Sequence, residues 1–376
     1  MFTAFYYIFS LFIYFISLPF LIILSFKSKY KKSIPARFFL YKNPPFCEKR
    51  YWFHSCSLGE TRALRPVIEQ FEKVNISVIT NTGFEEAKKY KNADVRFLPY
   101  EIFLPFWVKP CNTLIVMEAE LWYMLFYTAK RKCSKTVLLN ARISEKSYPK
   151  YLKFKWFYKK IFQNIDLVLA QSETDRQRLV SLGAKNVEVV GNIKTYFNPS
   201  ITTRYIKTKP LIVVASTHEN EEKLILENLP LNEYQVVVVP RHPERFEEVY
   251  KILNNYGSAV RISDICKNGE KECKLDGDLI LMDKMGELVN LYAVADIVIL
   301  GGSFVDNVGG HNPVEAAYFN KPIISGKYIF NQKALYSEVD GIVICDVDEI
   351  TDQLKNIQNT TIRNRTDIKK IISLIL

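Results

Sequence analysis

Short apolar runs rich in β-branched residues alternate with amphipathic stretches along most of this chain. Runs of this kind, separated by helical patterns, predict buried parallel strands in α/β sheets. The predicted strands are residues 51–53, 76–80, 95–98, 113–117, 136–139, 167–170 and 187–194, followed by 211–214, 234–239, 279–281, 295–300, 322–324 and 341–344. The pattern predicts two doubly wound parallel-sheet domains facing a cleft, with substrates at the carboxyl ends of both sets of strands.

The length of 376 residues suits about two domains of ordinary size. A polar stretch at residues 195–209 separates the two sets of predicted strands. We therefore expect a Rossmann-like N-terminal domain at residues 33–194, a linker at 195–209 and a Rossmann-like C-terminal domain at 210–376.

Residues 2–26 carry no charge and are rich in Phe, Tyr, Ile and Leu. As a helix they would extend about 37 Å, enough to cross a bilayer. Basic residues follow at once and place the rest of the chain in the cytoplasm: Lys27, Lys29, Lys31, Lys32 and Arg37. Because no small-residue cleavage pattern precedes them, we expect residues 1–26 to be a retained membrane anchor. The alternative is a helix that lies in the membrane interface.

The net charge of +11 suggests attraction to an anionic partner, such as nucleic acid, acidic lipid or a phosphorylated substrate. The basic residues are dispersed and no nucleic-acid-binding signature is present, so we expect no nucleic-acid partner. The seven cysteines are scattered without a CxxC pair, which indicates a reducing compartment. Cys266 and Cys273 are close in sequence, and we interpret their surroundings as a disordered loop rather than a metal site.

A glycine-rich loop at residues 301–310 follows one predicted strand and precedes a predicted helix. We expect Asn312 to be the N-cap of that helix, Pro313 its first residue and Glu315 the partner of a capping box. Free backbone N–H groups at such a junction favour an anion such as a nucleotide phosphate. A well-capped helix after a flexible loop that binds nothing is the alternative.

Charged residues also follow several of the other predicted strands. Glu60 belongs to a capping-box pattern with Ser57, but a carboxylate at a strand end could also be a general base. Glu118 and Glu120 follow another strand, where a carboxylate is costly unless it binds something. Arg241 follows a central strand and could pair with a phosphate. A further helix is expected to begin after Met285-Gly286-Glu287.

The chain contains only four histidines, and His54, His218, His242 and His311 all lie at or just after predicted strand ends. Taken singly, each is more simply a core histidine. Two acidic triplets, residues 276–278 and 346–348, formally resemble the DxD metal pair of some glycosyltransferases. They lie apart from the other motifs, so we assign no metal ligand. No Walker loop, GxSxG elbow or GxGxxG after the first strand is present.

Nine ordered motifs together resemble the 3-deoxy-D-manno-octulosonic acid (Kdo) transferases of lipopolysaccharide and lipid A biosynthesis. They are HSCSLGE (54–60), MEAELW (117–122), LNARIS (139–144), GNIK (191–194), STHENEE (216–222), PRHPERF (240–246), MGEL (285–288), GGSF (301–304) and GGHNPVE (309–315). The resemblance implies a GT-B fold, CMP-Kdo as donor and a lipid A precursor of the lipid IVA type as acceptor. It also implies an inverting reaction without metal or cofactor, at the cytoplasmic face of the inner membrane.

The same resemblance assigns roles to individual residues. Glu60 would be the base that takes the acceptor's proton, and Glu118 and Lys194 would stabilise the transition state. The N-terminal domain would bind the acceptor and the C-terminal domain the donor. The residues expected to hold CMP are Pro240, Arg241, Met285, Gly286, Glu287, Asn312, Pro313, Val314 and Glu315.

Two other classes of function remain open on the sequence alone. Another GT-B enzyme, such as a different lipid-directed sugar transferase or a sugar-nucleotide epimerase, would share the double sheet and the nucleotide-binding helix start. A non-catalytic membrane-anchored nucleotide-binding protein would also fit, and it would tolerate replacement of Glu60.

Overall fold

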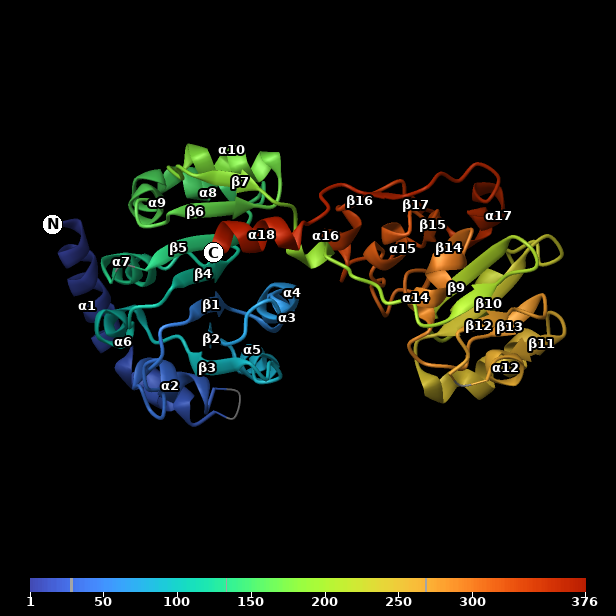
Figure 1. The fold of residues 1–376 in the computed structure, drawn as a ribbon, viewed down its shortest axis with the longest axis horizontal. Helices are drawn as coiled ribbons and strands as arrows, with labels where there is room; N and C mark the ends of the chain where they lie inside the picture. Colours follow the sequence, from blue (N-terminus) through green and yellow to red (C-terminus); the bar gives the residue numbers. More distant parts are fainter. Residues whose placement is uncertain (28–29, 133, 268) are drawn as a thin grey trace. The chain divides into compact units, whose positions relative to one another are not determined.

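The computed structural model describes residues 1–27, 30–132, 134–267 and 269–376, so that Lys29 and Cys133 lie outside the described residues. The chain forms two units (Figure 1). Unit 1 contains Met1–Tyr196 together with Asn364–Leu376, and unit 2 contains Phe197–Arg363.

Unit 1 is built on a seven-stranded sheet with the strand order β3-β2-β1-β4-β5-β6-β7, in which every pairing is parallel. Its strands are β1 Tyr51–Ser55, β2 Val74–Val78, β3 Ala93–Phe97, β4 Thr113–Met117, β5 Lys135–Ala141, β6 Leu167–Ala170 and β7 Val187–Val189. The order reverses between β1 and β4, which makes this the topological switch point of a doubly wound sheet.

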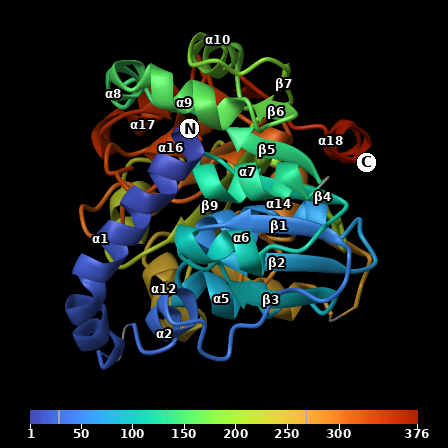
Figure 2. The ribbon, with the colours of Figure 1, turned by 90° about the vertical axis from the view of Figure 1, so that its left-hand side faces the viewer.

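Helices cover both faces of this sheet (Figure 2). They are α1 Phe2–Ser25, α2 Ser33–Phe38, α3 Leu58–Ala63, α4 Arg65–Ile68, α5 Asn81–Ala87, α6 Leu104–Trp107, α7 Tyr123–Arg131, α8 Tyr148–Lys153, α9 Lys155–Phe162, α10 Glu173–Ser181 and α18 Ile368–Ile375, with the 3-10 turns η1 Glu101–Phe103 and η2 Ile193–Thr195. Apolar side chains from alternate positions of the buried strands pack into two clusters, one on each face.

Unit 2 repeats the architecture with the strand order β11-β13-β10-β9-β14-β15-β17, again all parallel. These strands are β9 Leu211–Thr217, β10 Gln235–Pro240, β11 Ala259–Arg261, β13 Leu279–Leu281, β14 Ile297–Leu300, β15 Ile323–Ser325 and β17 Val343–Ile344. Its helices are α11 Glu221–Leu226, α12 Phe246–Asn254, α13 Ile262–Ile265, α14 Leu288–Val294, α15 Val314–Tyr318, α16 Lys333–Tyr336 and α17 Ile350–Gln353, with η3 Pro243–Arg245 and η4 Val347–Glu349. The switch point of unit 2 lies between β9 and β14.

Every strand predicted from the apolar runs is present, and the prediction of two doubly wound parallel sheets is confirmed. The predicted linker at residues 195–209 is wrong in part, because it contains the strand β8 (Arg204–Ile206). This strand pairs with β12 (Glu272–Lys274) and buries Tyr205 in unit 2. A second small pair, β16 (Val339–Asp340) with β18 (Thr361–Ile362), was not predicted either.

Cys266 and Cys273 themselves do not lie in a disordered loop, contrary to the expectation from the sequence. Both side chains are buried in the apolar core of unit 2, and Cys273 lies on β12. Burial beside the Cys266 side chain raises the pKa of the Cys273 thiol to about 12. These residues are therefore packing elements of the second unit.

The end of the chain also departs from the predicted boundary of 210–376, because residues 364–376 return to unit 1. Ile368, Ile371 and Ile375 of α18 are buried in the core cluster that also contains β1 and β4 side chains. The Lys135 ammonium donates to the carbonyl oxygen of Leu374 at 2.9 Å. Apolar residues at helical spacing require a buried face, and the sheet of unit 1 supplies it.

Helix α1 packs against the rest of unit 1 along much of its length (Figure 2). The hydroxyl of Tyr7 donates to the Ile102 carbonyl at 3.0 Å, and the hydroxyl of Tyr14 donates to the Phe38 carbonyl at 2.7 Å. The opposite face carries exposed phenylalanine and isoleucine side chains. By length and composition α1 could cross a membrane, but one of its faces is already occupied by protein.

Candidate active site

Two catalytic candidates of unit 1 follow the strands that flank the switch point. Glu60 lies on α3, directly after β1, and Glu118 directly follows β4. Because β1 and β4 are parallel neighbours, their carboxyl ends meet at one edge of the sheet. This edge is where ligands of doubly wound sheets bind.

The Glu60 carboxylate is held by its own helix start. One carboxylate oxygen accepts the Cys56 backbone N–H at 2.8 Å, and the other accepts the Ser57 hydroxyl at 2.9 Å. Ser57 is the N-cap, and its hydroxyl oxygen accepts the Glu60 backbone N–H at 3.3 Å. The expected cap is therefore present. Each carboxylate oxygen retains a free lone pair, so the cap orients a group that can still accept a proton.

Burial shifts the pKa values of three ionisable groups near Glu60, and these shifts limit which group can act as a nucleophile or base. Burial, with the Glu120 and Glu60 carboxylates nearby, raises the pKa of the Cys56 thiol to about 12. Cys56 is therefore a thiol at neutral pH and a poor nucleophile. Burial also raises the pKa of Glu120, which accepts the Trp122 indole N–H at 2.7 Å. Burial lowers the pKa of the Arg37 guanidinium to about 10, and the Glu120 carboxylate opposes that change.

Glu118 and Lys194, which are far apart in sequence, form an ion pair with 2.5 Å between the Lys194 Nζ and Glu118 Oε1 atoms. Glu118 adopts a left-handed backbone with φ of 51°, and Asn140 after β5 has φ of 57°. Asn140 joins the two segments, because its side-chain oxygen accepts the Ile193 N–H at 2.9 Å and its side-chain amide donates to the Glu118 carboxylate at 3.5 Å. Such conformations are costly for non-glycine residues and cluster at functional sites.

Asn140 was missed among the candidate residues, although the sequence carried a signal for it. It lies in the LNARIS segment, directly after a buried apolar run. Asparagine tolerates the left-handed region better than most residues, so a strand that ends in Asn is a place to expect a turn with a functional side chain.

In unit 2 the buried carboxylate of Glu221 holds the glycine-rich loop that follows β14 at the switch point. Glu221 is fully buried at the start of α11, and its oxygens accept the backbone N–H groups of Gly302, Ser303 and Phe304 at 2.6, 3.0 and 2.9 Å. A fourth N–H, from His218, donates at 3.0 Å. These donors partly offset the effect of burial, which raises the pKa of Glu221. The glycine loop thus presents these N–H groups to protein and not to a ligand.

Three of the four histidines gather beside this loop. The Nε2 atoms of His218 and His311 are 2.9 Å apart, and the His218 and His242 rings meet edge to face. Burial and the nearby His218 and Arg241 charges lower the pKa of His311 to about 4, and burial with His242 lowers that of His218. Gly302, at φ of +70°, has no room for a side chain, because a Cβ would lie 2.7 Å from the His311 ring.

His54, in contrast, is the core histidine that the sequence allowed. It is completely buried on β1, and its Nδ1 atom lies 2.9 Å from the Ser77 hydroxyl. Burial lowers its pKa to about 3, so the ring is neutral in the folded protein.

The predicted CMP-binding residues lie in loops at the carboxyl edge of the unit 2 sheet. Pro240 ends β10, and the exposed Arg241 follows it. Arg241 is close enough to His311 and Glu315 to lower the pKa of both, although burial raises the pKa of Glu315 overall. The structure therefore brings Arg241, His311 and Glu315 together.

The start of α15 differs in detail from the expected capping box. Helix α15 begins at Val314, and its N-cap is Pro313, which makes no side-chain cap. The Asn312 side-chain oxygen still accepts the Val314 N–H at 3.0 Å. Glu315 accepts the Asn312 side-chain amide at 3.3 Å and does not reach back to its backbone. Pro313 already has helical dihedral angles, with φ of −79° and ψ of −17°, so the helix start differs from the expected one by a single residue.

Met285, Gly286 and Glu287 follow β13 and precede α14, as expected. Met285 is exposed, and Gly286 has a positive φ of 85° with open space where a Cβ would stand. Glu287 accepts the Tyr205 hydroxyl at 2.8 Å and the Asn290 amide at 2.7 Å. These bonds hold the Glu287 carboxylate at the β13 end of the sheet.

The two acidic triplets have structural partners. Asp278 lies before β13, at the opposite edge from the motif loops, and pairs with Lys209 at 2.8 Å. Asp346 caps η4 in a complete capping box with Glu349 and pairs with Lys327 at 2.8 Å.

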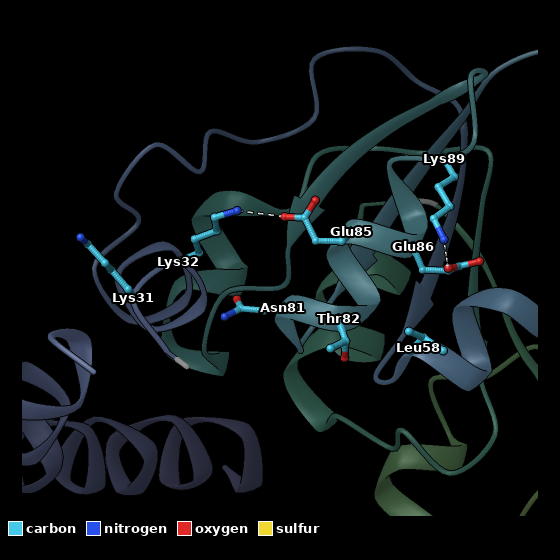
Figure 3. Close-up of a pocket in the computed structure, with 8 residues that line it drawn as sticks. All are labelled: Lys31, Lys32, Leu58, Asn81, Thr82, Glu85, Glu86 and Lys89. Atoms are coloured by element: carbon cyan, nitrogen blue, oxygen red, sulfur yellow. Dashed lines mark hydrogen bonds and ion pairs between the residues drawn. The ribbon is translucent and has the colours of Figure 1, made fainter. Parts of the chain in front are cut away.

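A pocket of about 460 Å³ opens on unit 1 beside the helix that carries Glu60. Its lining is Lys31, Lys32, Leu58, Asn81, Thr82, Glu85, Glu86 and Lys89. Figure 3 shows Lys32 reaching Glu85 and Lys89 reaching Glu86, while Lys31 points away. Two of the three lysines are thus paired with glutamates, and Lys31 leaves one excess positive charge in the lining next to α3.

Two Rossmann-like units with functional loops at both switch points define the GT-B class of glycosyltransferases. Residues 32–197 match the family model described as 3-deoxy-D-manno-octulosonic-acid transferase (kdotransferase). The chain is 31% identical over 374 residues to the 3-deoxy-D-manno-octulosonic acid transferase of Haemophilus influenzae, covering 90% of this chain and 85% of that protein. The chain belongs to this family of Kdo transferases.

A second relative is longer than this chain. The bifunctional glycosyltransferase/methyltransferase of Fusobacterium nucleatum is 33% identical over 349 residues, covering 83% of this chain. The match spans 53% of that protein, about half of its length.

Solved structures similar to this chain include the C-terminal CMP-Kdo binding domain of WaaA from Acinetobacter baumannii. The match is 34% identical and covers 38% of this chain and 77% of the solved domain, with a TM-score of 0.33. Another similar structure is the UDP-GlcNAc 2-epimerase of Neisseria meningitidis. The match covers 87% of this chain and 99% of the epimerase at 12% identity, with a TM-score of 0.46.

Proposed function

We propose that this glycosyltransferase moves Kdo from CMP-Kdo to a lipid A precursor of the lipid IVA type, with inversion and without a metal ion. The observation that carries the proposal is the placement of Glu60 and of the Glu118–Lys194 pair at the carboxyl edge of the unit 1 sheet. Family membership supports the donor.

In this proposal Glu60 removes the proton from the acceptor hydroxyl. The hydroxyl oxygen then forms a bond to the anomeric carbon of Kdo, while the bond from that carbon to the CMP phosphate breaks. CMP leaves with the bonding electrons, and the proton stays on Glu60 until water removes it. The cap formed by Ser57 and Cys56 keeps the carboxylate oriented for that transfer, which is the requirement for a general base.

Lys194 and Glu118 would act on the charge that moves during transfer. Lys194 is a cation held by Glu118, and Asn140 fixes the segment that carries it. A preorganised cation stabilises negative charge that develops in the transition state without reorganising at that moment.

Unit 2 would hold the CMP part of the donor. Arg241 supplies a positive charge for the phosphate, and Glu315 can accept hydrogen bonds from ribose hydroxyls. Pro240 and the segments 285–287 and 312–314 would shape the rest of the CMP site from the same sheet edge.

We further infer that α1 holds the protein at the cytoplasmic face of the inner membrane. The basic residues Lys27 and Lys31 follow the apolar helix, and the anionic lipids of the cytoplasmic leaflet attract them. Because hydrogen bonds from Tyr7 and Tyr14 tie one face of α1 to unit 1, the helix offers only its other face to lipid. This arrangement supports a helix that lies in the membrane interface.

The test is to incubate the purified full-length protein with CMP-Kdo and a lipid A precursor and to weigh the lipid by mass spectrometry. A product heavier by one or more Kdo residues is expected, with unchanged yield in excess EDTA and an inverted anomeric centre by NMR. CMP binding without any lipid product would favour the non-catalytic alternative. Conversion of a sugar nucleotide without transfer would favour an epimerase.

A further inference from the structure

Helices α8 and α9, with the residues just before them, carry a surface rich in unpaired lysines. Residues 146–160 contain no acidic side chain and six lysines, namely Lys146, Lys150, Lys153, Lys155, Lys159 and Lys160. All six are exposed, and among the described residues none of them forms an ion pair. An unpaired cluster of this density is a local positive field that attracts an anionic surface.

The large apolar and aromatic side chains of the same segment include an inward-facing and an outward-facing set. Tyr148, Tyr151 and Phe157 pack against the core of unit 1. Leu152, Phe154 and Trp156 point outward and are 40%, 49% and 61% exposed. The inner set already anchors the helices, so the outer set is not needed to hold the fold. Exposed Trp and Phe among lysines are typical of a segment that sits at a membrane interface.

This surface adjoins the first turns of α1. The Phe2 ring lies 6.0 Å from the Trp156 ring, and the Tyr6 ring lies 5.8 Å from the Phe157 ring. Figure 2 shows the start of α1 next to α9. Phe5 and Phe9, one turn apart on α1, are both exposed and stack on each other. Apolar groups of α1 and basic groups of α8 and α9 therefore adjoin on one unit.

We propose that α8 and α9 form a second membrane-contact surface that binds the anionic headgroups of phospholipids. The lysines meet lipid phosphates, and Phe154 and Trp156 enter the boundary between headgroups and acyl chains. This inference rests on the proposed attachment of α1 to the membrane and adds the site that selects anionic lipid. Each lysine near an anionic surface contributes a modest, additive attraction.

The first test compares two triple variants of the full-length protein that lose the same charge. Lys153→Ala/Lys155→Ala/Lys159→Ala removes part of the proposed surface. Its control, Lys251→Ala/Lys271→Ala/Lys274→Ala, removes three exposed lysines of unit 2. Co-sedimentation with vesicles containing phosphatidylglycerol should weaken about 10- to 100-fold in the first variant only. Binding to vesicles of phosphatidylcholine alone should be similar in both.

The second test measures whether the Trp156 side chain enters the lipid. The other tryptophans are shielded, since Trp52 and Trp107 are almost completely buried and Trp122 is partly buried. Brominated phospholipids in the vesicles should quench the fluorescence of the parent protein, and Trp156→Phe should lose most of that quenching. Circular dichroism melting of every variant checks that the fold is intact.

The outcomes separate this inference from the proposed function, because Kdo transfer to acceptor in detergent and CMP affinity are measured on the same proteins. If the first triple variant binds anionic vesicles as tightly as the parent, or if Trp156→Phe leaves quenching unchanged, the lipid surface is overturned. A protein partner for this face would give that result. If lysine-dependent binding persists but no Kdo is transferred, the proposed function falls and the lipid surface stands.

Discussion

The Lys194 ammonium lies 2.5 Å from the Glu118 carboxylate, although the two residues follow different strands, β7 and β4. Both side chains remain partly exposed, at 37% and 25%. The pair is thus solvated enough to meet a ligand, and each charge orients the other.

We expect Lys194→Met to lower the rate of Kdo transfer by about 10²-fold, because a preorganised cation at the developing charge is lost. Stability should change by less than about 1 kcal/mol, since a partly exposed ion pair contributes little to folding. Lys207→Met is the matched control, because Lys207 pairs with Asp296 at 2.5 Å and is 35% exposed. Equal rate losses in the two variants would contradict a role for Lys194.

Glu60→Gln separates a general base from a helix cap. Glutamine can keep the hydrogen bond to the Cys56 N–H, so the melting temperature and CMP affinity should remain near those of the parent. Turnover should fall by about 10² to 10⁴ if the carboxylate takes the proton. Product formation at saturating donor and acceptor measures this, with the exposed Glu69→Gln as control. Transfer at the parent rate would remove Glu60 from the mechanism.

Glu221→Ala should destabilise unit 2 by about 3 kcal/mol or more. The substitution leaves the buried N–H groups of Gly302, Ser303 and Phe304 without their acceptor, and unpaired buried donors are costly. Urea unfolding would measure the loss. Glu219→Ala is the control, because Glu219 lies two residues away and is exposed. A change within about 0.5 kcal/mol in both variants would show that the loop does not depend on the carboxylate.

Arg241→Ala and Glu315→Ala should each weaken CMP binding by about 1 to 3 kcal/mol, the usual cost of losing a charge-assisted hydrogen bond in a closed site. Isothermal titration calorimetry of the full-length protein with CMP measures the effect. The exposed Lys251→Ala should bind CMP as the parent does. Unchanged affinity in both site variants would refute the donor-site assignment.

The histidine cluster predicts a loss of stability in mild acid. The pKa of His311 is lowered to about 4 and that of His218 is also lowered, so below the ordinary histidine value the unfolded chain binds more protons than the folded one. This stability is present above about pH 6.5 and is lost as the pH falls toward 4. Protonation of both rings would also break the hydrogen bond between them.

Melting curves between pH 7 and pH 5 test this, with His311→Gln beside the parent. The parent's melting temperature should fall more steeply with acid than that of the variant. The raised pKa values of Glu221 and Glu315 act in the opposite direction, and both groups remain in the variant. Their contribution is therefore common to both curves. Identical slopes would show that His311 is not the group that titrates.

The strands and the class of fold followed from the sequence because a buried parallel strand needs an uninterrupted apolar run. The runs that became β4, β6 and β13 were located to the residue. Motif order was also sufficient for the family, since the Kdo transferase resemblance rests on short segments that stay in register along the chain. These signals are local or linear, so no tertiary information was needed to find them.

Only the tertiary structure decided which distant segments meet. The apolar spacing of α18 required a buried face, but nothing local stated that the sheet of unit 1 would supply it. The ion pair of Lys194 with Glu118 and the contact of Glu221 with Gly302 likewise join segments separated by whole strands and helices. The physical reason is that periodicity specifies which side chains leave water, whereas the chain path determines the partner that each polar group finds.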